Sequence, residues 1–386
     1  MIDTITDSDN ASTTKRKGSI AAPVAFSALA VIGIVCWIMQ LTGVGALALT
    51  NQVMWGIYLV GFMLCTGISA GCLLFASSAI LFSGLAAFRP YSRIIAACSV
   101  CVGAVGAGLF IMADLGTPAR FWEMLAFAQV GSPLIWDTLI LLAYAVIGVT
   151  FTVQLTRAAT DESRLSNMKT IAIAAFIAAI CVAITSFVFV FQVARPSWNN
   201  PGQTLSFMLS ALVASGAVIM LVLAITNRSG YLPVGENTLG CMARTLAFIL
   251  FAEFIFVLAE IASGTFAGQG TEAQMVSWLI AGPGAPFFWV EICAFAASFV
   301  LLLQKSRSLQ LIGAISAFAA VLLVKYNLLQ VELFNPLLDF AQYPDGASLA
   351  SAVYLPSLIE WGVVVGIIGI VCLLLNLAMR KLDLGA

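Results

Sequence analysis

Ten apolar stretches dominate this sequence, and each is long enough to cross the roughly 30 Å hydrocarbon layer of a bilayer as a helix. With 61% hydrophobic and only 9% charged residues, the chain lacks the polar surface that a water-soluble protein of 386 residues needs. We therefore predict an all-α integral membrane protein of about ten transmembrane helices, in which a polar cytoplasmic tail (1–20) precedes a membrane domain (21–386). The predicted spans are 22–43, 53–85, 92–113, 134–156, 168–192, 205–226, 240–263, 286–304, 309–331 and 355–379.

Basic residues indicate the orientation of these spans, because segments rich in Lys and Arg stay in the cytoplasm. If the N-terminus is cytoplasmic, all 17 basic residues except Arg120, Arg195 and Lys325 fall in or beside cytoplasmic segments. The first apolar stretch shows no signal-peptide pattern, so we expect it to remain as a span. The sequence thus predicts a multi-pass protein of the cytoplasmic (inner) membrane with both termini in the cytoplasm.

Composition also excludes several classes of function. The near balance of 17 basic and 18 acidic residues argues against a nucleic-acid partner. The chain has no histidine, whereas a b-type haem buried in a helical bundle is normally held by axial histidines. The nine cysteines are scattered through apolar stretches, with one CxxC at Cys98 and Cys101, and they form no zinc or disulfide pattern. We expect neither haem nor metal nor a covalently bound cofactor.

Ionisable residues inside the predicted spans carry the strongest functional signal. A charge near the centre of the bilayer costs about 2.5–3.5 kcal/mol on an insertion scale, so such residues are usually turned inward, paired or functional. Glu253 and Glu260 lie seven residues apart and therefore on one face of the seventh span. The alternative for the outermost groups, above all Glu291 and Glu332, is a place among lipid headgroups or under a protein cap. The residues that form a candidate proton path are Glu253, Glu260, Glu291, Lys325 and Glu360.

Most of these groups, together with Asp114 and Arg120, gather toward the predicted outer leaflet. A cavity there can admit an amphipathic ligand from the lipid and still meet water. A quinone head fits this description, because its reduction needs hydrogen bonds at two carbonyl oxygens and a route for two protons. Carboxylates that reach water can supply both.

Two motifs that follow one another closely, DLGTPARFW at 114–122 and SPLIWD at 132–137, resemble the signature of the NrfD-like family, which includes the polysulfide reductase membrane subunit. An earlier helix is also similar to this family in Trp55, Tyr58 and the GISAG run at 67–71. YLPSLIEW at 354–361 resembles the last helix of the family's ten-span branch. That branch includes membrane subunits of hydrogenases, of a sulfite-reductase-linked complex and of alternative complex III.

The resemblance implies a pair of four-helix bundles flanked by two further helices. It also implies a quinone or quinol site near the periplasmic side, with menaquinone or ubiquinone as the substrate. The expected partners are an iron–sulfur subunit of the four-cluster ferredoxin type on the periplasmic face and a catalytic subunit, either a molybdenum enzyme or a hydrogenase. Members of the family generally carry no haem or metal of their own.

Carried onto this sequence, the resemblance makes Asp114 and Asp137 the polar pair with catalytic roles. The residues that it implies for quinone binding are Tyr58, Arg120, Trp122 and Trp136. Arg120 can pair with Asp114 or Asp137 across the short loop, either as a structural clamp or as part of the ligand site. Trp122 can equally serve as an anchor at the membrane interface.

Two other functions remain open from sequence. A secondary transporter also uses inward carboxylates, but the spans lack a matched pair of helices broken by Gly or Pro near the midplane. A purely structural membrane anchor for a complex would use the same outer surface as a quinone site.

Overall fold

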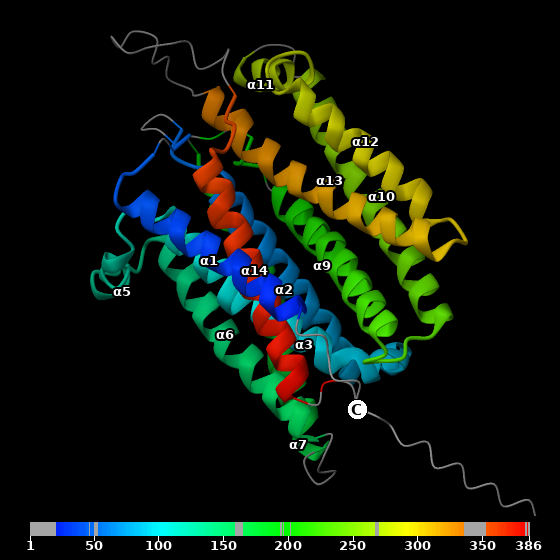
Figure 1. Ribbon diagram of the computed structural model, residues 1–386. Coiled ribbons are helices and arrows are strands. Elements are labelled where there is room, and N and C mark those ends of the chain that lie inside the picture. Colours follow the sequence, from blue (N-terminus) through cyan, green and yellow to red (C-terminus); the bar gives the residue numbers. More distant parts are fainter. Residues whose placement is uncertain are drawn as a thin grey trace, which may run out of the picture.

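The computed structural model, shown in Figure 1, describes residues 21–45, 47–49, 53–158, 165–193, 195, 197–200, 202–266, 270–335, 353–382 and 384. Within these ranges all regular structure is helical. Ten helical segments in this part of the chain are long and apolar enough to cross a membrane, which confirms the predicted fold class. The predicted polar tail at 1–20 lies outside the described residues.

Eight of the spans each follow one long helix. They are α1 (Ala21–Leu41), α2 (Ile57–Leu81), α6 (Pro133–Ala158), α9 (Gly202–Ser229), α10 (Glu236–Phe266), α12 (Ala285–Leu302), α13 (Arg307–Phe334) and α14 (Leu358–Lys381). Helices suit these apolar segments because they satisfy every backbone hydrogen bond within the segment, which lipid cannot do. At α14 a capping box starts the helix, in which the Ser357 hydroxyl accepts from the Glu360 N–H.

The third span and the fifth are composite. The third runs from Ser83 to Asp114 as a 3₁₀ segment η1 (Ser83–Tyr91), helix α3 (Ser92–Val100), a π-helical segment η2 (Cys101–Ala107) and helix α4 (Gly108–Asp114). The fifth combines α7 (Leu165–Ile184) and the short α8 (Phe187–Val190). Three further short helices lie between spans, namely η3 (Pro118–Arg120), α5 (Glu123–Ala126) and α11 (Thr271–Ile280).

The long helices form two four-helix bundles. The first contains α2, α3–α4, α6 and α7, and the second contains α9, α10, α12 and α13. Helix α2 also packs against α9 and α13 and thereby joins the bundles, while α1 and α14 pack together along the first bundle. This is the arrangement that the family resemblance implied.

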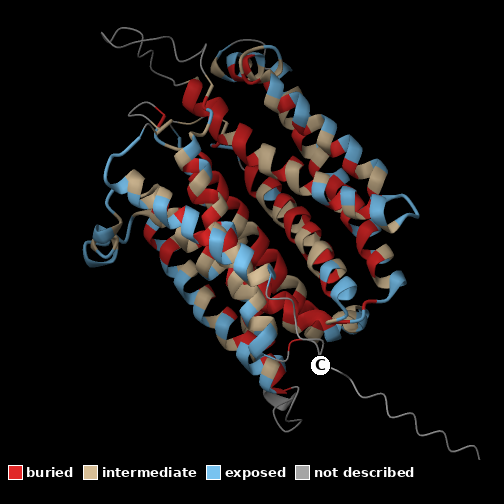
Figure 2. Ribbon diagram, viewed as in Figure 1, coloured by how far each residue is buried: buried red, intermediate tan, exposed pale blue. Residues whose placement is uncertain are grey.

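Helices α1 and α14 approach closely where Gly33 meets Gly366. A Cβ atom added to either glycine would collide with the backbone of the other, so this close crossing requires glycine at both positions. Most of α1 remains exposed, and Figure 2 shows exposed residues along the outside of the bundles and buried ones between them. The exposed side chains of the spans are largely apolar, as lipid contact requires.

Both α5, at the left in Figure 1, and α11, at the top, lie toward the same end of the tilted spans, the end that faces the upper left in this view. We call this end the α11 side. Because the spans alternate in direction, α4, α10 and α13 end there, and α6, α9, α12 and α14 begin there. The predicted orientation makes the α11 side periplasmic.

Candidate functional site

The structure distributes the predicted site residues over several places near the α11 side. One set lies in the second bundle around a cavity, a second lies at a hollow on the first bundle, and a third lies between the first bundle and the pair α1 and α14. Two of the predicted residues lie on an exposed loop.

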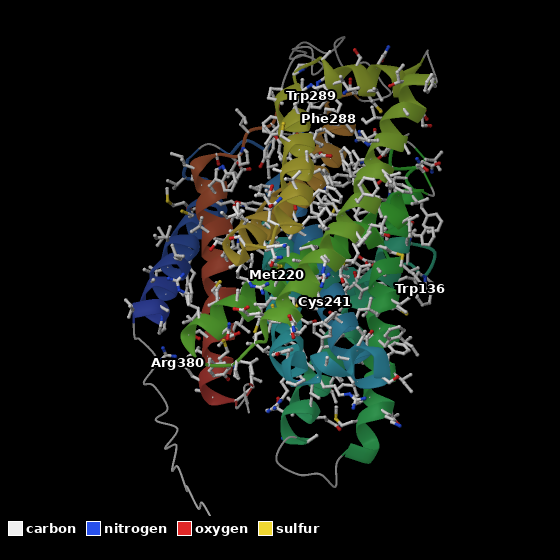
Figure 3. The ribbon with its side chains drawn as sticks, turned by 90° about the vertical axis from the view of Figure 1, so that its right-hand side faces the viewer. Trp136, Met220, Cys241, Phe288, Trp289 and Arg380 are labelled. Atoms are coloured by element: carbon white, nitrogen blue, oxygen red, sulfur yellow. The ribbon has the colours of Figure 1, made fainter. Side chains whose placement is uncertain are left out.

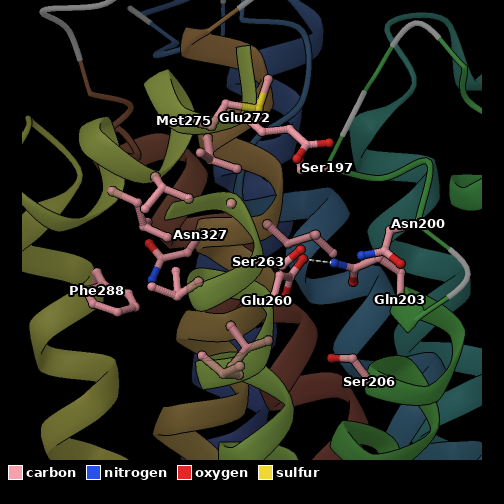
Figure 4. A pocket seen from close by; sticks show the side chains of 18 of the residues that line it. Ser197, Asn200, Gln203, Ser206, Glu260, Ser263, Glu272, Met275, Phe288 and Asn327 are labelled. Atoms are coloured by element: carbon pink, nitrogen blue, oxygen red, sulfur yellow. Dashed lines mark hydrogen bonds between the residues drawn. The ribbon is translucent and has the colours of Figure 1, made fainter. Parts of the chain in front are cut away.

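In the second bundle, a cavity of about 230 Å³ lies between α9, α10, α11, α12 and α13. Its volume is several times the about 30 Å³ that one water molecule occupies in the liquid. Apolar residues such as Phe288 and Met275 form part of the wall, and Glu260, Glu291 and Asn327 add polar groups. Figure 4 shows Phe288, Met275, Glu260 and Asn327 around the cavity.

Hydrogen bonds tie the carboxylates of this cavity to neighbouring helices. The Gln203 amide donates to Glu260, as the dashed line in Figure 4 shows, and Asn327 Nδ2 donates to Glu291 Oε2 at 2.7 Å. Ser206, which also lines the cavity, donates to Glu253 Oε1 at 2.9 Å. Glu253 and Glu260 thus lie on the same inward face of α10, as their spacing predicted.

Lys325 lies among these acidic groups on α13. It is only 3% exposed, and its ammonium lies 3.6 Å from the centre of the Phe207 ring, a cation–π contact. Its charge interacts with the carboxylates of Glu253, Glu260 and Glu291. The predicted proton-path residues from three helices are therefore neighbours, apart from Glu360.

The Glu332 carboxylate closes the second bundle on the α11 side. It is buried, and its Oε1 accepts both from the Ser197 backbone N–H and from the Ser197 hydroxyl at 2.5 Å. The nearby Arg195 side chain donates to the Glu332 carbonyl oxygen at 3.0 Å. Of the two alternatives for Glu332, headgroup contact or a protein cap, the structure shows the cap.

Asp137 opens α6 and lines a hollow of about 340 Å³ at the surface of the first bundle. The other walls come from α6, α7 and α8 and include Trp136, Phe187 and Phe191. Thr185 lines the hollow together with Asp137, and its hydroxyl donates to the Val182 carbonyl at 2.7 Å. Trp136 lies at the edge of the molecule in Figure 3 and is 53% exposed, and its indole N–H donates to the Val130 carbonyl at 2.8 Å.

Asp114, at the end of α4, lies elsewhere. One of its carboxylate oxygens is buried without a hydrogen-bond partner among the described residues. Its charge interacts with Tyr58, whose hydroxyl donates to Gln40 Oε1 at 2.7 Å. Gln40 in turn donates to the Ala113 carbonyl at 2.9 Å. Asp114 and Tyr58 are thus neighbours, held by a hydrogen-bond chain that α1 supplies.

Glu360 joins this region rather than the cavity of the second bundle. It accepts from the Ser357 N–H at 2.6 Å, from the Tyr354 hydroxyl at 3.2 Å and from the Ala48 N–H at 3.3 Å. Burial raises the pKa of the Tyr354 phenol, so this group remains a proton donor. The Tyr326 hydroxyl donates to the Tyr354 carbonyl, which links α13 of the second bundle to this cluster.

The predicted pairing of Arg120 with Asp114 or Asp137 is wrong. Arg120 instead pairs with Glu123 three residues later, through contacts of 2.8 Å and 2.7 Å. Both residues lie on the loop around η3 and α5, where the local turn brings them together more easily than a long reach to either aspartate. Trp122 is 59% exposed on the same loop and packs against Phe127. Arg120 and Trp122 are not among the described residues that line the two cavities.

Several polar residues of these places were not predicted. Gln203 and Ser206 bind the two carboxylates of α10, and Gln40, Thr185 and Tyr354 complete the other clusters. Polar residues at 203, 206 and 210 recur at helical spacing at the start of an apolar span. That stripe is the signal that would have marked α9 as a wall of the cavity.

Comparison with known proteins agrees with this architecture. Residues 45–334 match the family model described as polysulphide reductase, NrfD. A Halobacterium salinarum protein, named as a candidate membrane subunit of dimethyl sulfoxide reductase, is 26% identical over 393 residues, which cover 92% of this chain and 89% of the relative. A subunit of the selenate reductase of Mesobacillus selenatarsenatis is 25% identical over 396 residues, covering 92% of each chain. The chain belongs to the NrfD polysulphide reductase family.

Proposed function

We propose that this chain is the quinone-reactive membrane subunit of a respiratory oxidoreductase complex. The observation that carries the proposal is Asp137, a partly buried carboxylate in a hollow with apolar and aromatic walls at the surface of the first bundle. Membership of the NrfD family and two relatives named as subunits of reductases support the assignment to such a complex.

The hollow suits a quinone ring in both size and chemistry. Its volume of about 340 Å³ falls within the roughly 300–1,000 Å³ typical of small-molecule sites. Trp136, Phe187 and Phe191 offer faces for a flat ring, and the surrounding lipid gives access to the apolar tail of the molecule. Asp137 and Thr185 are the polar groups that can reach a quinone carbonyl oxygen.

In this proposal Asp137 exchanges a proton with the quinone. Reduction adds two electrons and two protons to the two carbonyl oxygens, and oxidation of the quinol returns them. Asp137 transfers one of these protons as a general acid or base. Asp114, which lies beside Tyr58 near the α11 side, is the second group that exchanges a proton in this proposal. Asp114 thus keeps its predicted catalytic role, although its surroundings differ from those of Asp137.

The electrons pass to or from partner proteins. We propose an iron–sulfur protein of the ferredoxin type on the α11 side, because that side carries the loops and the candidate quinone site. We propose a molybdenum enzyme as the catalytic partner in preference to a hydrogenase, because the two relatives are named as subunits of dimethyl sulfoxide and selenate reductases. Removal of an oxygen atom from such a substrate is a two-electron reaction that matches the two electrons of a quinol.

The test replaces Asp137 with Asn in the assembled complex. Asn keeps the size and a hydrogen bond but cannot exchange a proton, and acid–base participation typically contributes about 10²–10⁴ in rate. We expect quinol-dependent turnover to fall at least about tenfold, while turnover with a soluble artificial electron donor stays unchanged. Glu123→Gln, a carboxylate on the exposed loop, is the matched control and should retain both activities.

The alternative functions predict other results. Quinol-dependent turnover at the wild-type level in Asp137→Asn and in Asp114→Asn would favour a purely structural anchor. Solute uptake by vesicles that contain only this chain would favour a secondary transporter.

A further inference from the structure

The interior of the second bundle is polar in one half and apolar in the other. On α10, the buried residues before Glu253 are all apolar, from Leu239 to Leu250. On α13, the buried residues from Gly313 to Val321 are apolar, and the buried residues from Lys325 onward include several polar ones. Gln310, buried near the start of the same helix, donates to the Gln304 carbonyl at 2.7 Å. On α12, Phe288 and Glu291 precede the buried Phe295 and Leu302. The polar half is always the one nearer the α11 side.

Polar groups in the apolar half are few among the described residues, and backbone carbonyls of the same helix or of a neighbouring helix accept their hydrogen bonds. Ser298 donates to the Gly313 carbonyl at 2.8 Å, and Ser215 donates to Leu212 within its own helix. Phe254 packs against the buried Phe295 between α10 and α12. Phe251 and Phe299 form a second ring contact between these helices, nearer their outer surface. Water that enters the cavity therefore finds no polar route onward through the described residues of this half.

The polar half contains more acidic than basic groups. Glu253, Glu260 and Glu291 all interact electrostatically with one ammonium, that of Lys325, which leaves an excess of two negative charges if all four groups are ionised. The other charged groups near this set are Glu272 on α11, which lines the cavity, and Glu332 with Arg195 at the cap. Two uncompensated charges at this depth would be strongly unfavourable in a low-dielectric interior.

Two kinds of ligand can remove this excess, a metal cation or protons. The described His, Cys, Asp and Glu residues form no group of three that could hold a metal ion. Protons need no such geometry. Three polar atoms of the region, Lys325 Nζ, Glu253 Oε2 and Asn327 Oδ1, are buried and have no partner among the described residues. Asn327 lines the cavity, so water there can bind its free oxygen.

We propose that the cavity of the second bundle is a proton-loading site, which holds two protons on its carboxylates and exchanges them with water on the α11 side only. Each proton arrives as hydronium, converts one carboxylate into a carboxylic acid and leaves a water molecule. The remaining carboxylate and the Lys325 ammonium then balance one another. The apolar half makes the cavity a closed reservoir and not a transmembrane channel. The proposal stands apart from the quinone site at Asp137.

Infrared spectroscopy of the purified full-length chain at neutral pH tests the loading. We expect a C=O stretching band of carboxylic acids that shifts in D₂O. When one of the three carboxylates is replaced by an amide, one proton instead of two balances the charge. The part of the band that comes from this cavity should therefore fall by about half in Glu253→Gln and in Glu291→Gln, measured as the difference from the wild type so that the other carboxyl groups of the chain cancel. Glu236→Gln, an exposed carboxylate at the opposite end of α10, should leave the band unchanged.

Lys325→Met provides an independent variant. Without the ammonium, the third carboxylate also needs a proton, so the part of the band that comes from the cavity should grow by about one half in the difference from the wild type. A band that is absent from the wild type, or that none of these folded variants alters, would overturn the proposal. Folding of each variant is checked by its elution volume and melting temperature.

Passive proton flux across a membrane tests whether the apolar half of the second bundle blocks protons. Liposomes that contain the wild-type chain should hold an imposed pH gradient as long as empty liposomes do, in the presence of a potassium ionophore that removes the membrane potential. Rapid collapse of the gradient in wild-type liposomes, restored to the slow rate by Glu253→Gln, would show a continuous path and contradict the reservoir.

Discussion

Asp114 and Asp137 show how two carboxylates that are close in sequence come to occupy different environments. The family motif places them on either side of a short loop, and a pair was the natural prediction. In the structure, α4 ends facing α1 and Tyr58, whereas α6 begins facing α7 and α8. Which way each helix end faces depends on packing between distant segments, and the spacing within one motif does not contain that information.

Tryptophan substitution separates a wall of the hollow from the exposed loop. Aromatic stacking contributes about 0.5–1.5 kcal/mol beyond area burial, so Trp136→Ala should raise the KM for quinol by about twofold to tenfold and change kcat little. Trp122→Ala is the control, because Trp122 packs on the loop against Phe127. Steady-state kinetics of the complex measure both. An equal rise in KM in the two variants would assign Trp122 to the quinone site, and no rise in either would remove Trp136 from it.

Most elements followed from the pattern of apolar residues, and the exceptions have local causes. The second predicted span ran from 53 to 85, but α2 ends at Leu81, because Phe82 adopts an extended backbone (φ −106°, ψ 127°) before the 3₁₀ segment that begins the next span. The glycine-rich stretch at 265–285 was predicted not to cross the membrane, and it forms the short α11 instead. The seven-residue spacing placed Glu253 and Glu260 on one face correctly. It did not show that Lys325 lies opposite them, because α10 and α13 meet only in the folded bundle.

The contact between α1 and α14 predicts a sharp effect of one methyl group. Gly33→Ala places a Cβ against the Gly366 backbone, and such overpacking typically costs about 1–3 kcal/mol. We expect a lower melting temperature in detergent. The control is Gly108→Ala, since a Cβ there meets no atom within 4 Å and the better helix propensity of Ala gives about 0.5–1 kcal/mol of stabilisation. Equal melting temperatures for the two variants would contradict the close crossing.

The ten spans of the described residues determine which helix ends lie on the same side of the membrane. The even number of spans puts the start of α1 and the end of α14 on the side opposite α11. The distribution of basic residues predicts that this side is cytoplasmic. A reporter enzyme that is active only in the periplasm, fused after Arg380, should therefore be inactive, and an active fusion would reverse the orientation.

The most direct test of the central claim compares two electron donors in the assembled complex with and without this chain. If the chain supplies the quinone site, its deletion should abolish quinol-dependent reduction of the terminal substrate. Turnover with a reduced viologen, which delivers electrons to the partner proteins directly, should persist in the same preparation. Quinol-dependent turnover that survives the deletion would contradict the claim that this chain reacts with quinone.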